Sequence, residues 1–374
     1  MTGSCYLTIA PKIITRRLSN EGDQLRIGFH SQGLSLRGTE IALYDYALHN
    51  QTILNNDSVI FHKLQNSQDS QVLKKFQKHF KVLGYETNSD LCKHAESEKI
   101  DLAYFIKSGD RDGSVLGDIP TAVHAVFPTK PSEFHGDKFA FVSEWLAKEY
   151  SNNIIPFVPH MITRSNIAGD LRDALSIPVH YTVLGCYGGS DSFNLAFVHK
   201  AILDALTIRM DIFFIFMNIT PFAKHERLLF LPGSADLAQK EKFINTCDGM
   251  IHARGIGESF GLACGEFSIR NKPVITYSMS PQRSHIEILG DKCILYNGAA
   301  EIRHILLNFN QSIQHERIWD AYSDRFGPMP VMSQFKNIFM GKKTELKLSS
   351  YDLAMIQGYR FIRKIRNLRK KLYC

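Results

Sequence analysis

The stretch from Asp248 to Tyr277, DGMIHARGIGESFGLACGEFSIRNKPVITY, decides how the rest of the chain is interpreted. It opens with a short apolar run and continues through a turn crowded with glycine. Apolar residues then recur at helical spacing from Phe260 to Ile269, and Pro273 introduces the apolar pair Val274-Ile275. This order predicts a strand, a glycine-rich turn, a helix and a second strand.

Two carboxylates bracket this turn, Glu258 before the predicted helix and Glu266 within it. A helix that starts near Gly261 has unpaired N–H groups and partial positive charge at its first turn, which suits a phosphate or a polar sugar. Carboxylates accept hydrogen bonds from hydroxyl groups. The turn therefore predicts a nucleotide-sugar site. The simpler alternative is an ordinary helix start with Glu266 in solvent.

The same residues resemble family 4 of the retaining glycosyltransferases, which have the GT-B fold. That family carries Glu, seven residues and Glu, with Phe-Gly-Leu after the first Glu and a Pro-Val-Ile-like strand beyond. The matching residues are Glu258, Phe260, Gly261, Leu262, Glu266 and the run from Pro273 to Ile275. The resemblance implies that Glu258 contacts donor-sugar hydroxyls, that Glu266 holds the ribose hydroxyls, and that the amides of Phe260, Gly261 and Leu262 touch the sugar.

Length and composition fit two ordinary soluble domains. The chain has 374 residues, 22% of them charged, and a net charge of +7, which favours an anionic ligand without requiring nucleic acid. Seven cysteines are scattered without metal-site spacing, which indicates a reducing compartment. Cys247 and Cys264 are expected to be buried thiols. Neither a signal peptide nor a membrane span is indicated, so we expect a cytoplasmic protein.

The first half predicts a Rossmann-like domain. A strand from Leu25 to Phe29 runs into a loop with Gly38, and Thr39 is expected to cap the helix that follows. The spacing is not G-x-G-x-x-G, so a dinucleotide cofactor is not favoured. By resemblance, Gly38 lines the cleft between the domains, although a plain turn is an equal alternative. His124 lies in an apolar strand, where it either reaches the donor sugar, as in many family members, or is a core residue.

The second half repeats the pattern of strand, glycine loop and helix, which predicts a second Rossmann-like domain. The resembling family has Arg and Lys in this loop to hold the diphosphate, but here Cys186 and Asp191 stand near those positions. Backbone N–H groups around Gly188 and Gly189 would then hold the diphosphate. Arg254 is a candidate for the missing cation, against a surface arginine as the alternative.

The chain ends in a predicted helix with an apolar stripe and many cations. Among its cations are Arg360, Arg363, Lys364, Arg366, Arg369, Lys370 and Lys371. In GT-B chains the last helix commonly returns to the first domain. A basic amphipathic helix can also touch an anionic membrane, but a packed helix with a solvated basic face is the favoured alternative.

Together these patterns predict an α/β protein of the GT-B type, with two Rossmann-like domains facing a central cleft. Residues 1–165 would form the acceptor domain, 166–345 the donor domain, and 346–374 a basic helix packed on the first. The predicted activity is retaining transfer of a hexose from a UDP- or GDP-sugar to a glycan or glycolipid acceptor, without metal or other cofactor and without nucleic acid. The alternatives are a non-catalytic nucleotide- or sugar-binding protein of this fold and a dinucleotide-dependent oxidoreductase.

Overall fold

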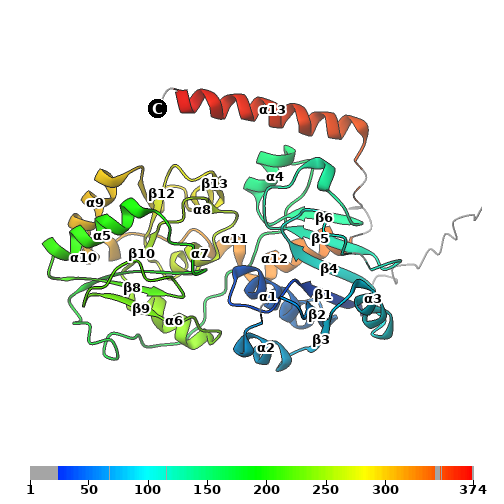
Figure 1. Cartoon of the computed structure of the whole chain (residues 1–374), viewed down its shortest axis with the longest axis horizontal. Helices are drawn as coiled ribbons and strands as arrows, with labels where there is room; N and C mark the ends of the chain where they lie inside the picture. The colour runs from blue at the N-terminus through cyan, green and yellow to red at the C-terminus, as the bar shows by residue number, and fades with distance from the viewer. Residues whose placement is uncertain (1–23, 67, 115, 342–345, 347, 373–374) are drawn as a thin grey trace, which may run out of the picture.

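The computed structural model describes residues 24–66, 68–114, 116–341, 346 and 348–372, with side chains up to residue 365. Within these residues, two parallel six-stranded sheets form two lobes that lie side by side (Figure 1). The lead-in predicted for residues 1–24 lies, except for Gln24, outside the described residues. The two predicted α/β domains are therefore present in the structure.

The first lobe is built from alternating strands and helices. Its elements are β1 (Arg26–Ser31), α1 (Gly38–Thr52), β2 (Asp57–Lys63), α2 (Ser70–Gln77), β3 (Lys81–Tyr85), α3 (Asn88–Ser97), β4 (Leu102–Lys107), β5 (Thr121–Ala125), η1 (Pro131–Glu133), β6 (Lys138–Phe141) and α4 (Glu144–Ser151). The strand order is β3-β2-β1-β4-β5-β6, and every neighbouring pair is parallel. This is the order of a Rossmann-type sheet.

The second lobe repeats that topology. Its elements are β7 (Thr182–Tyr187), α5 (Ala196–Ile208), β8 (Ile212–Met217), β9 (Leu228–Leu231), α6 (Leu237–Thr246), β10 (Gly249–His252), β11 (Gly257–Glu258), α7 (Leu262–Ser268), β12 (Val274–Tyr277), β13 (Gln282–Arg283), α8 (Ser284–Leu289), β14 (Ile294–Tyr296), α9 (Ala299–Asn308) and α10 (Gln311–His315). The sheet order is β9-β8-β7-β10-β12-β14, so the second lobe has the same order of successive strands as the first. The short strands β11 and β13 pair with each other beside the main sheet.

Burial on both faces explains why the strands are apolar along their length. On β2, Val59 and Phe61 belong to the core that Leu91 of α3 joins, whereas Ile60 belongs to the core formed with α1 and α2. All six residues of β8, IFFIFM, are buried. A parallel sheet covered by helices on both faces selects such runs, because alternate side chains enter two different cores.

The chain returns to the first lobe earlier than the sequence predicts. Residues after α10 continue through α11 (Ser323–Phe326), α12 (Pro328–Phe335), the π-helix η2 (Lys336–Met340) and α13 (Ser350–Leu372). Phe335 of α12 packs against the rings of Phe29, Tyr46 and Tyr104 in the first lobe. The segment that joins the first lobe therefore begins near α12, before the boundary at residue 345 that the sequence indicates.

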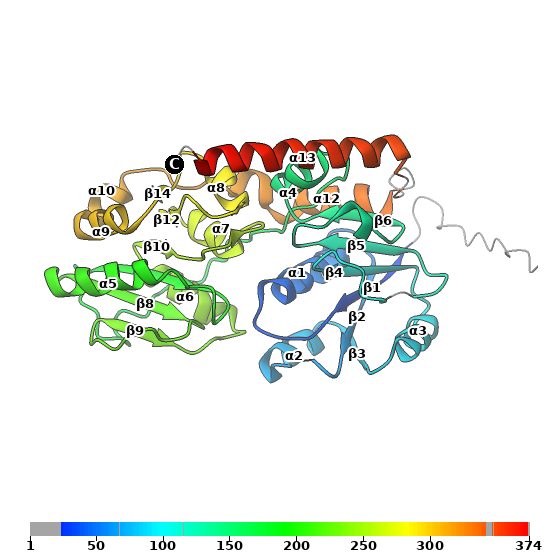
Figure 2. The same cartoon turned by 45° about the horizontal axis from the view of Figure 1, so that its top comes forward.

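Helix α13 crosses over α4, on the same side of the molecule in both views (Figures 1 and 2). Ile356 is fully buried, and Arg363 pairs with Glu149 and lies 4.5 Å from the centre of the Tyr150 ring. Ile356 and Arg363 thus hold α13 against the first lobe. None of the helices in the described part of the chain is long and apolar enough to cross a bilayer.

Two local predictions are wrong. From Gln71 to Leu83, lysines alternate with apolar residues at helical spacing, which predicts one helix. The helix ends at Gln77 instead, and residues from Lys81 form the edge strand β3, where lysine is tolerated. Thr39 does not cap α1, since the helix starts at Gly38 and the Thr39 hydroxyl donates to Glu40. The segment Ile302–Tyr322, which the sequence predicts to be largely helical, is helical to Asn308 in α9 and again over Gln311–His315 in α10, with a break between the two helices.

Candidate functional site

The turn after β10 lies where an open parallel sheet binds ligands. In each sheet the strand order reverses between the two central strands, β1 and β4 in the first and β7 and β10 in the second. Loops at the carboxyl ends of such strands form the binding crevice of doubly wound folds. The loop after β7 carries Gly188 and Gly189, and the turn after β10 carries Arg254 and Glu258. The sheet topology therefore brings these two predicted segments to one place.

The first lobe meets this turn through the loop after β1. A Cβ atom added to Gly38 would lie 3.3 Å from Leu262 Cδ1, at the first residue of α7. In the same loop, Leu36 Cδ1 would lie 2.8 Å from a Cβ on Gly233, which follows β9. Gly38 thus lies between the lobes, opposite the predicted Phe-Gly-Leu segment.

Two glycines shape the turn itself. Gly257 has φ +77° and Gly261 has φ +93°, a region that side-chain-bearing residues rarely adopt. A Cβ on Gly257 would lie 2.0 Å from the carbonyl oxygen of Gln282, and one on Gly261 would lie 2.7 Å from His285 Cβ. The glycines are therefore required both by backbone conformation and by the close approach of β13 and α8.

Glu258 is held between two donors. Its Oε1 lies 3.2 Å from His252 Nε2, and its Oε2 lies 3.0 Å from Arg254 Nη1. Burial by itself raises the pKa of a carboxyl group, but the hydrogen bond from His252 and the charge of Arg254 outweigh it and lower the pKa of Glu258 to about 2. The side chain keeps 22% of its surface exposed. Glu258 is thus an ionised, oriented carboxylate that a ligand can reach.

A buried chain of hydrogen bonds fixes the orientation of His252. Its Nδ1 lies 2.9 Å from Thr276 Oγ1, which lies 2.9 Å from His285 Nε2. Burial lowers the pKa of His285 to about 3, so this ring is neutral and its Nε2–H can donate to Thr276. Thr276 can then donate to His252 Nδ1, which leaves the Nε2–H of His252 for Glu258. Sequence reasoning missed His252 and Thr276 because they read as ordinary strand residues.

Glu266 is not solvated. It lies on α7 with 13% of its side chain exposed, and its Oε1 is 2.5 Å from Lys240 Nζ on α6. Burial raises the pKa of Glu266 to about 8, and the carboxylate of Asp45 on α1 adds to the rise. Burial likewise lowers the pKa of Lys240 to about 8, although the charge of Asp45 opposes this shift. The alternative of a solvated Glu266 is therefore wrong, and a first-lobe residue, Asp45, lies close enough to act on this pair.

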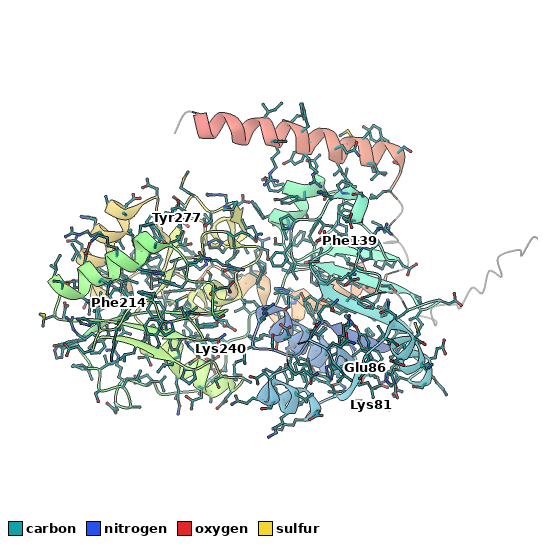
Figure 3. All side chains as sticks on the ribbon, viewed as in Figure 1. Lys81, Glu86, Phe139, Phe214, Lys240 and Tyr277 are labelled. Carbon is teal, nitrogen blue, oxygen red and sulfur yellow. The ribbon has the colours of Figure 1, made fainter. Side chains whose placement is uncertain are left out.

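Lys240 is a candidate site residue that the sequence did not reveal. It lies at the border between the two lobes, as Figure 3 shows. It lines a hollow of about 40 Å³ together with Glu40 and Tyr44 of the first lobe. Its ammonium group lies 5.9 Å from the centre of the Tyr187 ring, and Tyr187 directly precedes Gly188. The sequence shows only a lysine on an amphipathic helix, so its position next to the glycine loop required the fold.

The structure also shows where Cys186 and Asp191, the two residues that depart from the family pattern, lie. Cys186 is buried in β7, where burial raises the pKa of its thiol, and Asp191 is exposed. Asn194 connects the loop after β7 to the turn after β10, because its Oδ1 accepts a hydrogen bond of 2.8 Å from the amide of Gly255. Arg254 is partly exposed and is engaged by Glu258. Cys247 and Cys264 are buried thiols, as predicted.

Phe260 and His124 occupy the interior. Phe260 is buried, with its ring 5.4 Å from His160 and 5.3 Å from Phe326, so its side chain joins the lobes while its backbone borders the turn. His124 is fully buried, and its nitrogens lie 2.6 Å from Tyr104 Oη and 2.8 Å from the Val158 carbonyl oxygen. Both nitrogens are therefore occupied in the core, and we do not carry His124 into the proposed site.

Solved structures with the same architecture include a complex with a nucleotide sugar. HepE from Anabaena, solved in complex with UDP-glucose, matches with a TM-score of 0.66 at 14% identity, over 84% of this chain and 99% of HepE. A glycosyltransferase from Rickettsia africae matches with a TM-score of 0.62 at 12% identity, over 85% of this chain and 98% of its own. A putative UDP-N-acetylglucosamine 2-epimerase from Listeria monocytogenes matches with a TM-score of 0.57 at 12% identity, over 86% and 98%. The sequence matches no protein-family model and no curated protein.

At these identities the likeness establishes the fold. The chain has the GT-B fold, with two Rossmann-like lobes on either side of a cleft, as the sequence predicts. The activity has to be argued from the side chains at the site, because one fold carries several chemistries.

Proposed function

We propose that this protein is a retaining glycosyltransferase that moves a hexose from a nucleoside-diphosphate sugar to a carbohydrate acceptor. The observation that carries the proposal is Glu258, an ionised and partly exposed carboxylate at the switch point of the second sheet. Its neighbours His252 and Arg254 fix its orientation. The Glu-x7-Glu resemblance and the nucleotide sugar in the HepE structure support the same assignment.

In the proposed reaction, the bond between the anomeric carbon and the diphosphate oxygen breaks. The acceptor hydroxyl oxygen bonds to that carbon on the same face, and its proton passes to the leaving diphosphate. The sugar carries positive charge as the bond breaks, as in other glycosyl transfers. Glu258 would bind sugar hydroxyls and stabilise that charge, and Glu266 would accept hydrogen bonds from the ribose. No protein nucleophile is needed for this front-face transfer.

The leaving diphosphate needs positive charge more than it needs a base. We propose that Lys240 supplies part of that charge in place of the Arg and Lys of the family's glycine loop. Arg254, the amides of Gly188 and Gly189, and Gly38 from the other lobe would complete the diphosphate site. Transfer in this scheme proceeds without a metal ion.

A ligand screen with product analysis tests the proposal. The full chain is heated alone and with UDP, GDP, UDP-glucose, UDP-N-acetylglucosamine, GDP-mannose or NAD. A ligand at 100 times its dissociation constant adds about 2.7 kcal/mol to the free energy of unfolding, which is a clear thermal shift. We expect one nucleotide sugar to raise the unfolding temperature and to release free nucleoside diphosphate on incubation, with the anomeric configuration of the sugar retained.

Each competing function has its own outcome in this experiment. Binding without release of nucleoside diphosphate, also when methyl pyranosides are supplied as acceptors, would make the chain a non-catalytic binding protein, the alternative that Cys186 and Asp191 favour. Conversion of UDP-N-acetylglucosamine to its C2 epimer would assign the epimerase chemistry found on this fold. A shift with NAD alone would indicate an oxidoreductase, and no shift with any nucleotide would overturn the proposal.

We further propose that α13 brings the enzyme to an anionic membrane, where a glycolipid acceptor lies. Its outer face carries exposed apolar residues, namely Tyr351, Met355, Phe361, Ile362 and Ile365. The spacing of Tyr351, Met355, Ile362 and Ile365 puts these four on one face of the helix. Lys364 is exposed beside them, and the sequence continues with further cations whose side chains lie outside the described residues. An apolar face beside cations is typical of helices that lie on anionic lipid.

The membrane proposal predicts that the double change Phe361→Ser and Ile362→Ser weakens binding to vesicles several-fold. Sedimentation is measured with vesicles of phosphatidylcholine alone and with added phosphatidylglycerol. Wild-type protein should sediment only with the anionic vesicles. Ile318→Ser, which removes an exposed isoleucine from the second lobe, is the control. Equal sedimentation of the double variant and wild type would reject a membrane role for α13.

A further inference from the structure

A second hollow between the lobes has no role in the donor site described above. It has a volume of about 140 Å³ and lies between α4 of the first lobe, α8 of the second, and α11. A cavity of about 150 Å³ holds one benzene ring, so this hollow has room for a single six-membered ring. Its aromatic and apolar walls include Trp145, Phe157, Phe260 and Phe326.

The hollow adjoins the turn that carries Glu258. Phe260 lines it and lies two residues after Glu258. On the other strand of the small ladder, Arg283 pairs with Glu258, and the next residue, Ser284, also lines the hollow. A group bound here is therefore separated from the proposed sugar-binding carboxylate by one short ladder.

Ser284 provides the observation that points to a ligand. Its side chain lines the hollow, is only 1% exposed, and its Oγ has no hydrogen-bond partner among the described residues. Buried hydroxyl groups in folded proteins are nearly always hydrogen-bonded, because leaving one unpaired costs free energy. A ligand hydroxyl in the hollow would satisfy this group.

Charged groups at the rim also suit hydroxyl groups. Glu287 and Lys148 line the hollow, and so does the ion pair between Glu144 Oε2 and Arg325 Nη2, at 2.9 Å. Two carboxylates and two cations balance one another, so the site does not select a net charge. Aromatic walls with hydrogen-bonding groups at the edge fit a sugar ring, whose faces are C–H groups and whose edges are hydroxyls.

We propose that this hollow binds one pyranose ring of the acceptor, with Ser284 and Glu287 contacting its hydroxyls. The inference rests on the proposed transferase function and deepens it, because it assigns the acceptor a site that both lobes share. Residues of α4 on one lobe and of α8 on the other contact the same ring. Acceptor binding and closure of the lobes are thereby coupled.

Two variants test the acceptor site. Ser284→Leu fills the hollow, and Glu287→Gln removes a carboxylate from an exposed residue without changing its size. The probes are methyl α- and β-pyranosides of glucose, galactose, mannose and N-acetylglucosamine. Binding of each probe to the full chain is measured by saturation-transfer NMR in the presence of UDP. We expect at least one probe to bind wild type, to lose its signal with Ser284→Leu, and to bind about five- to tenfold more weakly to Glu287→Gln. Glu316→Gln, a matched change of an exposed residue, should bind like wild type.

The outcomes separate this inference from the function on which it rests. Two results would reject the proposed acceptor site and leave the proposed donor site intact. In the first, UDP shifts the unfolding temperature of wild type but no probe binds. In the second, Glu287→Gln and wild type bind the probes equally. If neither UDP nor any nucleotide sugar binds, the proposed function fails first. Both variants should bind UDP as wild type does, and a variant that loses UDP binding together with the probe would point to the donor sugar as the occupant.

Discussion

Replacing Glu258 with Gln is expected to lower kcat for sugar transfer by about 100- to 1,000-fold, the usual cost of removing one group that stabilises transition-state charge. The change keeps the size of the side chain and removes its negative charge. Arg254 and His252 then face a neutral amide, whose single oxygen cannot accept from both at full strength. The sugar loses a charged hydroxyl acceptor at the moment when positive charge develops on it. Release of nucleoside diphosphate and formation of product are the measurements.

The pKa of Glu258 makes this prediction independent of pH. Because the pKa is held at about 2, the carboxyl group is ionised in both the free enzyme and any assay above pH 4. The defect of Glu258→Gln should therefore be the same at pH 6 and at pH 8. Glu316→Gln is the matched control for the loss of one carboxylate. Activity of Glu258→Gln within threefold of wild type, with the variant folded and able to bind the donor, would remove Glu258 from the mechanism.

Replacing Lys240 with Met is expected to weaken binding of the nucleotide sugar by about 10- to 100-fold at pH 7. A hydrogen bond to a charged group contributes about 1.5–3 kcal/mol, and each 1.4 kcal/mol is tenfold in affinity. Met keeps the length of the apolar stem and removes only the ammonium group, which lies 5.9 Å from the centre of the Tyr187 ring. Isothermal titration with the best nucleotide sugar of the screen measures the change.

The wild-type affinity should also fall as the pH rises from 7 to 9. Lys240 and Glu266 both have pKa values of about 8, the first lowered and the second raised by burial. Each group loses a proton over this range, and each loss makes the site more negative toward a diphosphate that keeps its charge because both ends are esterified. Lys240→Met should show a shallower pH dependence, since only Glu266 still titrates.

Lys200→Met is the control for this pair of experiments. Lys200 is an exposed lysine on α5 that pairs with Asp204, four residues further along the same helix. Its loss should leave both the affinity and its pH dependence unchanged. If Lys240→Met binds the nucleotide sugar as tightly as wild type at pH 7, the diphosphate is held by other groups and the cation proposed to replace the family's Arg and Lys is wrong.

The turn after β10 could be predicted from the sequence because the residues that specify it are close together in the chain. Glycines at 257 and 261, an apolar strand before them and an apolar helix after them lie within thirty residues of one another, and the positive φ values bear out the need for glycine. The positions of β8 and β12 also follow from apolar runs, whereas β7 extends through Gly185 to Tyr187, beyond the apolar run that ends at Leu184. Strand β3 was missed because its lysine and its single glycine resemble the end of a helix, and only pairing with β2 makes it a strand.

The sequence by itself therefore determined the two Rossmann-like halves and the placement of Glu258 in a glycine turn, since neighbouring residues encode strands, helices and turns. Tertiary structure decided the rest. It joined Lys240 to Glu266, 26 residues away, connected His252 through Thr276 to His285, enclosed His124 in the core, and left a hollow between α4 and α8. These features depend on burial and on contacts between distant segments, which set pKa values and partners only after the lobes have packed together.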